Sequence, residues 1–457
     1  MFENDTIAAI STGMSSGGIG IIRISGNQAF FVIDSIFRGK DFLLQDCESH
    51  TIHYGHIYDD NKILDEVMVS IFRAPRTYTR EDVVEINCHG GLLILRKIFS
   101  LVLAQGVRPA QPGEFTKRAF LNGRIDLSQA ESVMDLISSK NEFALQNSLH
   151  LLSGFLSDKI KAIRNHLIYE IAYIESALDD PEHISLDGFD EHLSDMLVPM
   201  TDSLHKLSDS FCDGMHMKDG IYTVIAGKPN VGKSSLLNAL AKTDRAIVTN
   251  VPGTTRDTLE EQITIDGITL CLVDTAGIHS TEDEVEKMGV IRSLEGLQNA
   301  EFILFVVDSS CPLDDNDFDI IQKCKNRNVI VLLNKSDLTP VITCSDISSL
   351  IDAPVVLFSA KEQDGLDDLS KQIQKMFFHN TFSLSDELVI TNERQKFYID
   401  SALLSLTHVI ESIQSQMPED FLTIDLMDAY ENLGCILGEA VEDDLVDQIF
   451  SKFCMGK

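Results

Sequence analysis

The chain has 457 residues, which is enough for about three domains. It carries 37 Lys and Arg residues against 71 Asp and Glu residues, a formal net charge of −34. This balance argues against a protein that binds nucleic acid over a broad surface of its own, because a phosphate backbone needs clustered basic side chains. The hydrophobic content of 44% excludes wholesale disorder.

The charge is unevenly distributed. Residues 1–120 have a net charge of −2, from 12 basic and 14 acidic residues, so we expect a domain boundary near residue 120 and any anionic ligand in this first segment. Nine scattered cysteines without a C-x-x-C pair favour reduced thiols over a disulfide framework or a zinc site. The apolar runs are far shorter than the ~20 residues of a membrane span. We therefore expect a cytoplasmic protein with no membrane association.

The first segment, residues 1–120, predicts an α+β domain. It combines one helical pattern, Leu92–Leu103, with short β-like runs that Gly and Pro separate. These runs are Gly20–Ser25, Glu66–Phe72 and Val83–Asn87.

Helical patterns follow. Ser128–Glu131 fits a capping box that opens a helix. An apolar stripe between Leu145 and Leu178 predicts one long helix, bent at Ser153–Gly154. A second helical pattern extends from His192 to about Phe211.

Residues 221–358 change to β-rich runs that alternate with helical stretches, as in a parallel α/β sheet. The runs are Ile221–Ala226, Thr269–Val273, Phe302–Val307, Val329–Leu333 and Val355–Phe358. The remaining tail contains only amphipathic helical stripes, which must pack against other helices. We therefore predict a multidomain α/β protein in which an α/β domain, residues 218–378, is inserted into a helical domain built from residues 121–217 and 379–457.

A phosphate-binding motif lies directly after the first of these strands. Gly227–Ser234 fits G-x-x-x-x-G-K-[ST], in which backbone N–H groups surround phosphate oxygens. Lys233 would neutralise the terminal phosphates and Ser234 would place its hydroxyl on Mg²⁺. The predicted nucleotide-binding residues of this loop are Asn230, Val231, Gly232, Lys233, Ser234 and Ser235.

Three further motifs identify the nucleotide as GTP. Asp274, Thr275, Ala276 and Gly277 form D-x-x-G, whose carboxylate can hold the Mg²⁺ water shell. Asp337 can accept the adjacent N–H and NH₂ donors of guanine, a pair that adenine lacks. The alternative, that Asn334 and Asp337 merely cap a helix, is disfavoured by the order of the motifs. The predicted base-side residues are Asn334, Lys335, Asp337, Ser359, Ala360 and Lys361.

The residues expected to carry hydrolysis are unusual. Ile278 follows D-x-x-G where Ras-like GTPases have a Gln, and an aliphatic side chain cannot orient water. The Asn230 carboxamide, with loop carbonyls, suits a monovalent cation that could replace an arginine finger. Glu286 could position water, although a solvated acidic helix start is an equally good interpretation. The predicted switch residues are Thr249, Asn250, Val251, Pro252, Gly253, Thr254 and Thr255, with Thr255 as the second Mg²⁺ hydroxyl.

The pair of motifs G-x-P-N-x-G-K-S-S and G-T-T-R-D resembles the potassium-dependent TrmE–Era–EngA group of GTPases. Three stretches, Gly18–Gly26, Pro112–Glu131 and Phe453–Lys457, narrow the resemblance to the TrmE family, which modifies the tRNA wobble uridine. The resemblance runs over the whole chain. It implies that residues 1–120 form a folate-binding and dimerisation domain that holds a 5-formyl or methylene tetrahydrofolate.

The resemblance also implies site residues. The folate contacts would be Arg23, Glu81, Arg124 and Lys457. Without the resemblance, Arg23 or Glu81 alone would be interpreted as an ordinary charged residue on the surface of a strand. Arg124 occupies a position where other members often have Lys, so a planar guanidinium group replaces a compact ammonium group of the same charge. Cys454 is either a nucleophile toward C6 of uracil or a structural thiol, and the sequence does not decide between them.

In the α/β domain the resemblance assigns Mg²⁺ to Ser234 and Thr255, and water positioning to Glu286. The phosphate-binding motif makes Lys233 the second predicted catalytic residue of this domain. It assigns K⁺ to Asn230, Thr249, Val251 and Thr254. It further implies a homodimer activated when two GTPase domains meet, and a heterotetramer with a flavin-dependent subunit that carries FAD and uses NADH. Because the chain is acidic, we expect that partner to supply most of the tRNA-binding surface.

Two other interpretations stay open at this point. A ribosome-assembly GTPase of the Era or EngA kind predicts a basic RNA-binding module or a second P-loop, and the sequence has neither. A GTP switch that only scaffolds partners is favoured by Ile278.

Overall fold

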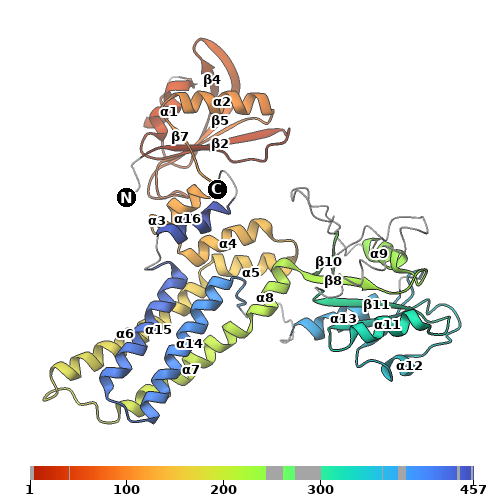
Figure 1. Cartoon of the computed structure of the whole chain (residues 1–457). Coiled ribbons are helices and arrows are strands. Elements are labelled where there is room, and N and C mark those ends of the chain that lie inside the picture. The colour runs from red at the N-terminus through yellow and green to blue at the C-terminus, as the bar shows by residue number, and fades with distance from the viewer. Residues whose placement is uncertain are drawn as a thin grey trace. The chain divides into compact units, whose positions relative to one another are not determined.

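The computed structural model describes residues 5–40, 42–242, 261–272, 300–362, 364–378, 388–439, 443–453 and 456 (Figure 1). Contacts divide the chain into two compact units. The first unit comprises Met1–Met134, Leu151–Met200 and Asp400–Lys457, and the second comprises Asp135–His150 and Thr201–Ile399. In the part of the chain that is described, no helix is both long enough and apolar enough to cross a bilayer.

A seven-stranded sheet in the order β3-β4-β5-β6-β2-β1-β7 forms the N-terminal part of the first unit. Its strands are β1 (Ile7–Ile10), β2 (Ile19–Ser25), β3 (Phe37–Arg38), β4 (Thr51–Asp59), β5 (Lys62–Phe72), β6 (Val83–His89) and β7 (Arg108–Pro109). Helices α1 (Ala29–Ile36) and α2 (Leu92–Ala104) share one apolar core with the sheet. The predicted α+β domain is confirmed, and β1, β4 and α1 are elements that the sequence analysis did not predict.

The helices of the first unit come from both ends of the chain. They include α3 (Glu114–Leu121), α6 (Phe155–Asp179), α15 (Glu419–Leu437) and α16 (Asp443–Ser451), while α4 (Leu127–Ser138), α7 (Phe189–Asp209) and α14 (Glu393–Gln414) extend into the second unit. Helix α15 packs along α6 (Figure 1). Arg164 of α6 donates to the Tyr430 carbonyl (3.1 Å) and pairs with Glu439 (2.6 Å). The helical domain is therefore built from both flanks of the α/β domain, as predicted.

Two local predictions need correction. Helix α4 begins at Leu127, and its capping box is Asp126 with Gln129: each side chain accepts the other's backbone N–H at 3.0 Å. Ser128, the predicted cap, is buried inside the helix and its Oγ donates to Asp126. The predicted long, bent helix is two helices, α5 (Glu142–Leu152) and α6, because Gly154 takes a left-handed φ of 98°.

The second unit contains a six-stranded sheet in the order β13-β12-β11-β8-β10-β9. Its strands are β8 (Ile221–Ala226), β9 (Glu261–Ile265), β10 (Ile268–Leu272), β11 (Phe302–Asp308), β12 (Val329–Asn334) and β13 (Val355–Leu357). All neighbours pair in parallel except the antiparallel β9 and β10. The predicted parallel α/β sheet is confirmed.

Helices cover both faces of this sheet. Apolar residues of α9 (Lys233–Lys242) and α13 (Leu366–Phe377) belong to the core on one face. Those of α11 (Asp315–Cys324) and α12 (Cys344–Ser348) belong to the core on the other. Helix α8 (Phe211–Asp219) leads into β8. This double coverage leaves the carboxyl ends of the parallel strands as the edge where a ligand can bind.

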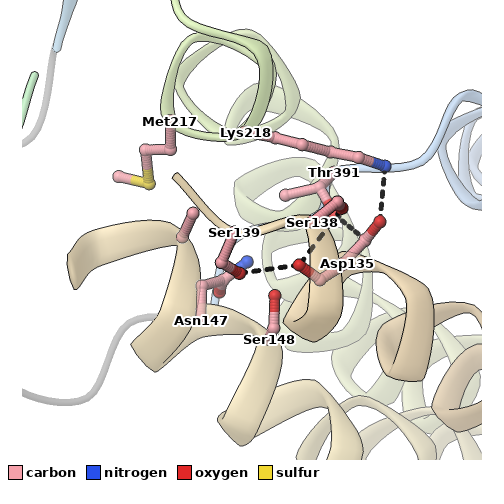
Figure 2. Close-up of a pocket in the computed structure, with 9 residues that line it drawn as sticks. Asp135, Ser138, Ser139, Asn147, Ser148, Met217, Lys218 and Thr391 are labelled. Atoms are coloured by element: carbon pink, nitrogen blue, oxygen red, sulfur yellow. Dashed lines mark hydrogen bonds and ion pairs between the residues drawn. The ribbon is translucent and has the colours of Figure 1, made fainter. Parts of the chain in front are cut away.

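A small polar pocket lies between helices α4, α5 and α8 and the segment that contains Thr391 (Figure 2). Asp135 pairs with Lys218 (2.7 Å) and accepts a hydrogen bond from Thr391 (3.1 Å). Asn147 donates to the Val389 carbonyl (2.9 Å). These contacts attach α4 and α5 to Lys218 of α8 and to the segment Val389–Thr391, so the pocket is held together by polar groups that satisfy one another.

Candidate nucleotide and folate sites

The phosphate-binding loop connects β8 to α9, as its motif predicts. Gly227 (φ 151°) and Gly232 (φ 101°) have backbone conformations that side-chain-bearing residues rarely adopt. Lys233 donates its Nζ protons to the carbonyl oxygens of Gly227 (2.7 Å) and Lys228 (2.9 Å). The ammonium group is therefore held over the loop, where it can meet phosphate oxygens. Asn230 is exposed and left-handed, with φ 64°.

Asn334 connects this loop to the base-side loops. It ends β12, is 2% exposed, and donates from Nδ2 to the Val231 carbonyl (2.8 Å). Its Oδ1 accepts the backbone N–H of Ala360 (3.2 Å). A Cβ at Gly232 would lie 2.2 Å from Asn334 Nδ2, so only glycine allows this approach. One side chain thus ties together three separate segments of the predicted site.

Asp337 lies in the same group of loops. Its Oδ1 accepts a hydrogen bond from Ser359 Oγ (2.9 Å), and the neighbouring Ser336 N–H donates to the Phe358 carbonyl (3.2 Å). Lys361, which follows, has a side chain 78% exposed. The structure therefore brings the N-K-x-D and S-A-K segments together at the carboxyl edge of the sheet, as their positions after successive strands predict.

Two acidic contacts near this site were missed by the sequence analysis. Lys228, inside the phosphate-binding loop, pairs with Asp317 (2.7 Å) and Asp314 (3.0 Å) at the start of α11. Asp317 is fully buried. Lys335 pairs with Asp308 (2.5 Å), the last residue of β11. No sequence motif joins residues about 27 or 89 positions apart, so only the fold reveals these pairs.

Several predicted site residues lie outside the described residues. These are Thr249, Asn250, Val251, Pro252, Gly253, Thr254, Thr255, Asp274, Thr275, Ala276, Gly277, Ile278, Glu286, Cys454 and Lys457. Their roles stay predictions. Among the residues that the structure does describe, no group of three His, Cys, Asp or Glu side chains is placed to hold a metal ion.

Two of the four predicted folate residues, Arg23 and Arg124, lie against Tyr78 in the first unit. The guanidinium of Arg124 lies 4.5 Å from the Tyr78 ring centre and that of Arg23 lies 5.6 Å from it. Arg23 also pairs with Glu85 (2.8 Å) and donates to the carbonyl of Gly456 (3.5 Å), next to the predicted Lys457. Arg23 of β2 therefore lies close both to Arg124, through the shared Tyr78 ring, and to Gly456. Tyr78 itself was not predicted, because a lone Tyr gives no signal in the sequence.

Glu81 is held by a buried ionic network. It accepts hydrogen bonds from Ser25 Oγ (2.7 Å) and from Arg118 Nη1 (3.1 Å). Arg118 is 4% exposed and also pairs with Asp5 (2.6 Å) and Glu114 (3.1 Å). Burial opposes the charge on Arg118, but the carboxylates outweigh it and raise its pKa. The i, i+4 spacing of Glu114 and Arg118 is the only trace of this network in the sequence.

Burial also opposes the charge on Glu114 and by itself would raise the pKa of this carboxyl. Hydrogen bonds from Arg108 and from the Gln111 backbone N–H outweigh burial, so the pKa of Glu114 lies below its ordinary value. Both members of the Glu114–Arg118 pair therefore stay ionised at neutral pH. The network fixes the Glu81 side chain, whose oxygens can accept hydrogen bonds from N–H donors.

A phosphate-binding loop followed by N-K-x-D and S-A-K loops on a parallel sheet defines a P-loop GTPase. Two family models match the chain: the MnmE helical domain over residues 127–454, and the GTP-binding protein TrmE N-terminus over residues 6–124. The chain belongs to the TrmE, or MnmE, family of tRNA modification GTPases. This assignment favours the tRNA-modification interpretation over an Era- or EngA-like one.

Two similar proteins match this chain over its whole length. The tRNA modification GTPase MnmE of Lachnoclostridium phytofermentans is 53% identical over 457 residues, which covers 100% of both chains. That of Staphylococcus aureus strain Newman is 45% identical and covers 99% of both. Among solved structures, the G domain of the T. maritima FeoB iron transporter is 27% identical, with a TM-score of 0.26, covering 34% of this chain and 98% of its own. A variant of Aquifex aeolicus Era bound to GDP.AlF4⁻ is 28% identical, with a TM-score of 0.26, covering 40% and 66%.

Proposed function

We propose that the chain is the GTP-hydrolysing subunit of a cytoplasmic tRNA-modifying complex. The complex adds an aminomethyl or carboxymethylaminomethyl group to C5 of the wobble uridine, with a tetrahydrofolate derivative as one-carbon donor. The observation that carries the proposal is Asn334, whose buried side chain joins the phosphate-binding loop to the base-side loops. We further propose the domain boundaries 1–120, 121–217, 218–378 and 379–457 for this function.

The described residues fit a guanine nucleotide. Lys233 rests on two loop carbonyls, and phosphate oxygens would be stronger acceptors for its ammonium protons. Asp337 is exposed and held by Ser359, so its carboxylate can accept the paired donors of guanine. Because adenine does not present that pair, Asp337 would set the preference for GTP.

Two of the proposed cation ligands, Asn230 and Ser234, are described and lie on the phosphate-binding loop and at the start of α9. Ser234 begins α9 beside Lys233 and is exposed, as a hydroxyl ligand of Mg²⁺ must be, and Thr255 is the second proposed ligand. Asn230 is exposed at the turn of the loop, where its carboxamide oxygen can face a monovalent cation, together with Thr249, Val251 and Thr254. When bound, the two cations would neutralise negative charge that develops on the phosphates. Glu286 would orient the attacking water.

The folate proposal rests on the convergence around Tyr78. The two guanidinium groups of Arg23 and Arg124, which the Tyr78 ring holds side by side, suit the anionic glutamate tail of the folate. Glu81, fixed by Arg118, can accept the amino and N–H donors of a pterin. Lys457 and Cys454 would complete the site from the C-terminus.

We propose that the first unit forms a homodimer. Strands β4 and β5 expose a strip of large side chains on their outer face: Ile52 is 66% exposed, Tyr54 60% and Met68 49%. Tyr54 and Met68 are directly opposite in the sheet register. Exposed apolar groups in one patch are typical of an interaction surface. A flavin-dependent subunit carrying FAD and using NADH would bind the dimer to form a heterotetramer and would supply most of the tRNA contacts.

GTP turnover measured in KCl and in NaCl tests the catalytic proposal. We expect selective stimulation by K⁺, and we expect Asn230→Ala to abolish that stimulation while nucleotide binding is largely retained. Asp368→Asn, an exposed substitution on α13, serves as the charge control. Slow hydrolysis that does not respond to the cation would contradict the proposal and favour a GTP switch that only scaffolds partners.

A further inference from the structure

Asp308 stands beside the base-recognition loop without belonging to any of its motifs. It ends β11 and is paired in the sheet register with Asn334, the end of β12. Its side chain is 8% exposed. One carboxylate oxygen accepts the backbone N–H (3.0 Å) and the hydroxyl (2.6 Å) of Ser310, and the other pairs with Lys335 Nζ (2.5 Å). Every described contact of this carboxylate therefore either fixes Asp308 itself or fixes Lys335.

Lys335 needs such a partner because of its backbone. Its φ is 63°, in the left-handed region that a residue with a Cβ enters only at a cost. This one residue separates Asn334, whose side chain is turned toward the phosphate-binding loop, from the turn that carries Asp337. A return of Lys335 to an ordinary φ would redirect the chain on both sides of it. The ion pair with Asp308 opposes that return.

The charge on Asp308 is secured by its surroundings. Burial tends to raise its pKa, but the Lys335 ammonium and the Ser310 donors outweigh that effect and keep the pKa below the ordinary value. The carboxylate is thus available to Lys335 at any pH at which the protein is expected to work. A neutral amide of the same shape would keep a hydrogen bond but lose the attraction between the charges.

We propose that Asp308 is a positioning residue for guanine recognition: by pairing with Lys335 it stabilises the left-handed turn that aims Asn334 at the phosphate-binding loop and Asp337 at the base. This inference rests on the proposed GTP binding. It predicts a defect that is shared by GDP and GTP, because both carry the same base, and that leaves the chemical step at saturating GTP unaffected.

The test uses the full-length protein and fluorescent GDP and GTP analogues. Asp308→Asn should weaken both nucleotides by the same factor, roughly tenfold, and should raise KM for GTP with kcat unchanged. Asp368→Asn, which removes an equally charged group from an exposed site on α13, should change affinity less than twofold. Unchanged affinity in Asp308→Asn, or a loss confined to GTP, would overturn the inference.

A double-mutant cycle separates this role from a general structural one. In a Lys335→Gly background, glycine adopts the positive φ without strain and has no ammonium group to pair. Asp308→Asn should then change nucleotide affinity less than twofold. An equal loss in both backgrounds would show that Asp308 acts independently of Lys335 and would overturn the inference. If the unaltered protein bound no guanine nucleotide, the proposed function itself would fail.

Discussion

Lys228 lies inside the phosphate-binding loop, yet its side chain points to α11, and its removal should destabilise the second unit. It pairs with Asp317, which is 0% exposed, and with Asp314, which is 49% exposed. Replacing Lys228 by Met leaves the buried Asp317 carboxylate without its cation. Removing one partner of a buried ion pair costs about 3–5 kcal/mol. The Lys228 side chain is 17% exposed and so partly hydrated, which brings our expectation to about 2–3 kcal/mol.

The second substitution in this test is Asp317→Asn. In the unaltered protein Asp317 Oδ2 accepts the Asp314 backbone N–H at 3.1 Å. An Asn side chain keeps an oxygen that can accept this hydrogen bond, but it carries no charge to be buried. The double variant Lys228→Met/Asp317→Asn should therefore be more stable than Lys228→Met alone. This reversal distinguishes an unpaired charge from a simple loss of packing.

Urea unfolding of the full chain, followed by circular dichroism, measures the effect. Lys371→Met is the control, because Lys371 is 72% exposed and lies 3.6 Å from an exposed Asp368. This control should change the free energy of unfolding by less than about 0.5 kcal/mol. If Lys228→Met changed it as little, or if the double variant were the least stable, the assignment of Lys228 as an anchor of the loop would be refuted.

Three other predictions follow from the described contacts. Gly232→Ala places a Cβ 2.2 Å from Asn334 Nδ2 at a φ of 101°, so it should lower the affinity for GDP by at least about tenfold in a fluorescence titration; normal affinity would contradict the role of this approach. Because the pKa of Glu114 is lowered in the folded protein, its ion pairs stabilise the first unit fully at pH values above 4.5, the ordinary pKa. This stabilisation is lost as the pH falls through the lower pKa of the folded protein. Glu114→Gln should therefore flatten the loss of stability in urea unfolding between about pH 5 and pH 2, and an unchanged slope would contradict it. Tyr78→Leu should weaken 5-formyl tetrahydrofolate binding by about tenfold in calorimetry, whereas unaltered binding would place the folate elsewhere.

The sequence predicts most strongly what depends on local chemistry. The glycines and Lys233 of the phosphate-binding loop occur at a fixed spacing, and the structure has this loop between a strand and a helix as expected. The β-rich runs of the second unit became strands because each is an apolar run too short for a helix. Asn334 and Asp337 could be placed at one edge, since parallel strands end at the same side of a sheet.

Contacts between distant segments could not be predicted. Asp308 and Lys335 are joined only because β11 and β12 are neighbours, and Tyr78 is significant only because Arg23 and Arg124 approach its ring. The capping error at Ser128 has a local cause. Two overlapping patterns, beginning at Asp126 and at Ser128, have almost equal preference for a cap, and tertiary packing that buries Ser128 decides between them.

We propose above all that guanine-nucleotide turnover at this site serves the modification of tRNA. Cells from which the chain has been removed should be complemented with the unaltered protein or with Lys233→Ala, and their tRNA nucleosides compared by mass spectrometry. We predict that the C5-modified wobble uridine is lost on removal, is restored by the unaltered chain, and is not restored by Lys233→Ala. Wobble uridine that stays modified in the absence of the chain, or full restoration by Lys233→Ala, would contradict it.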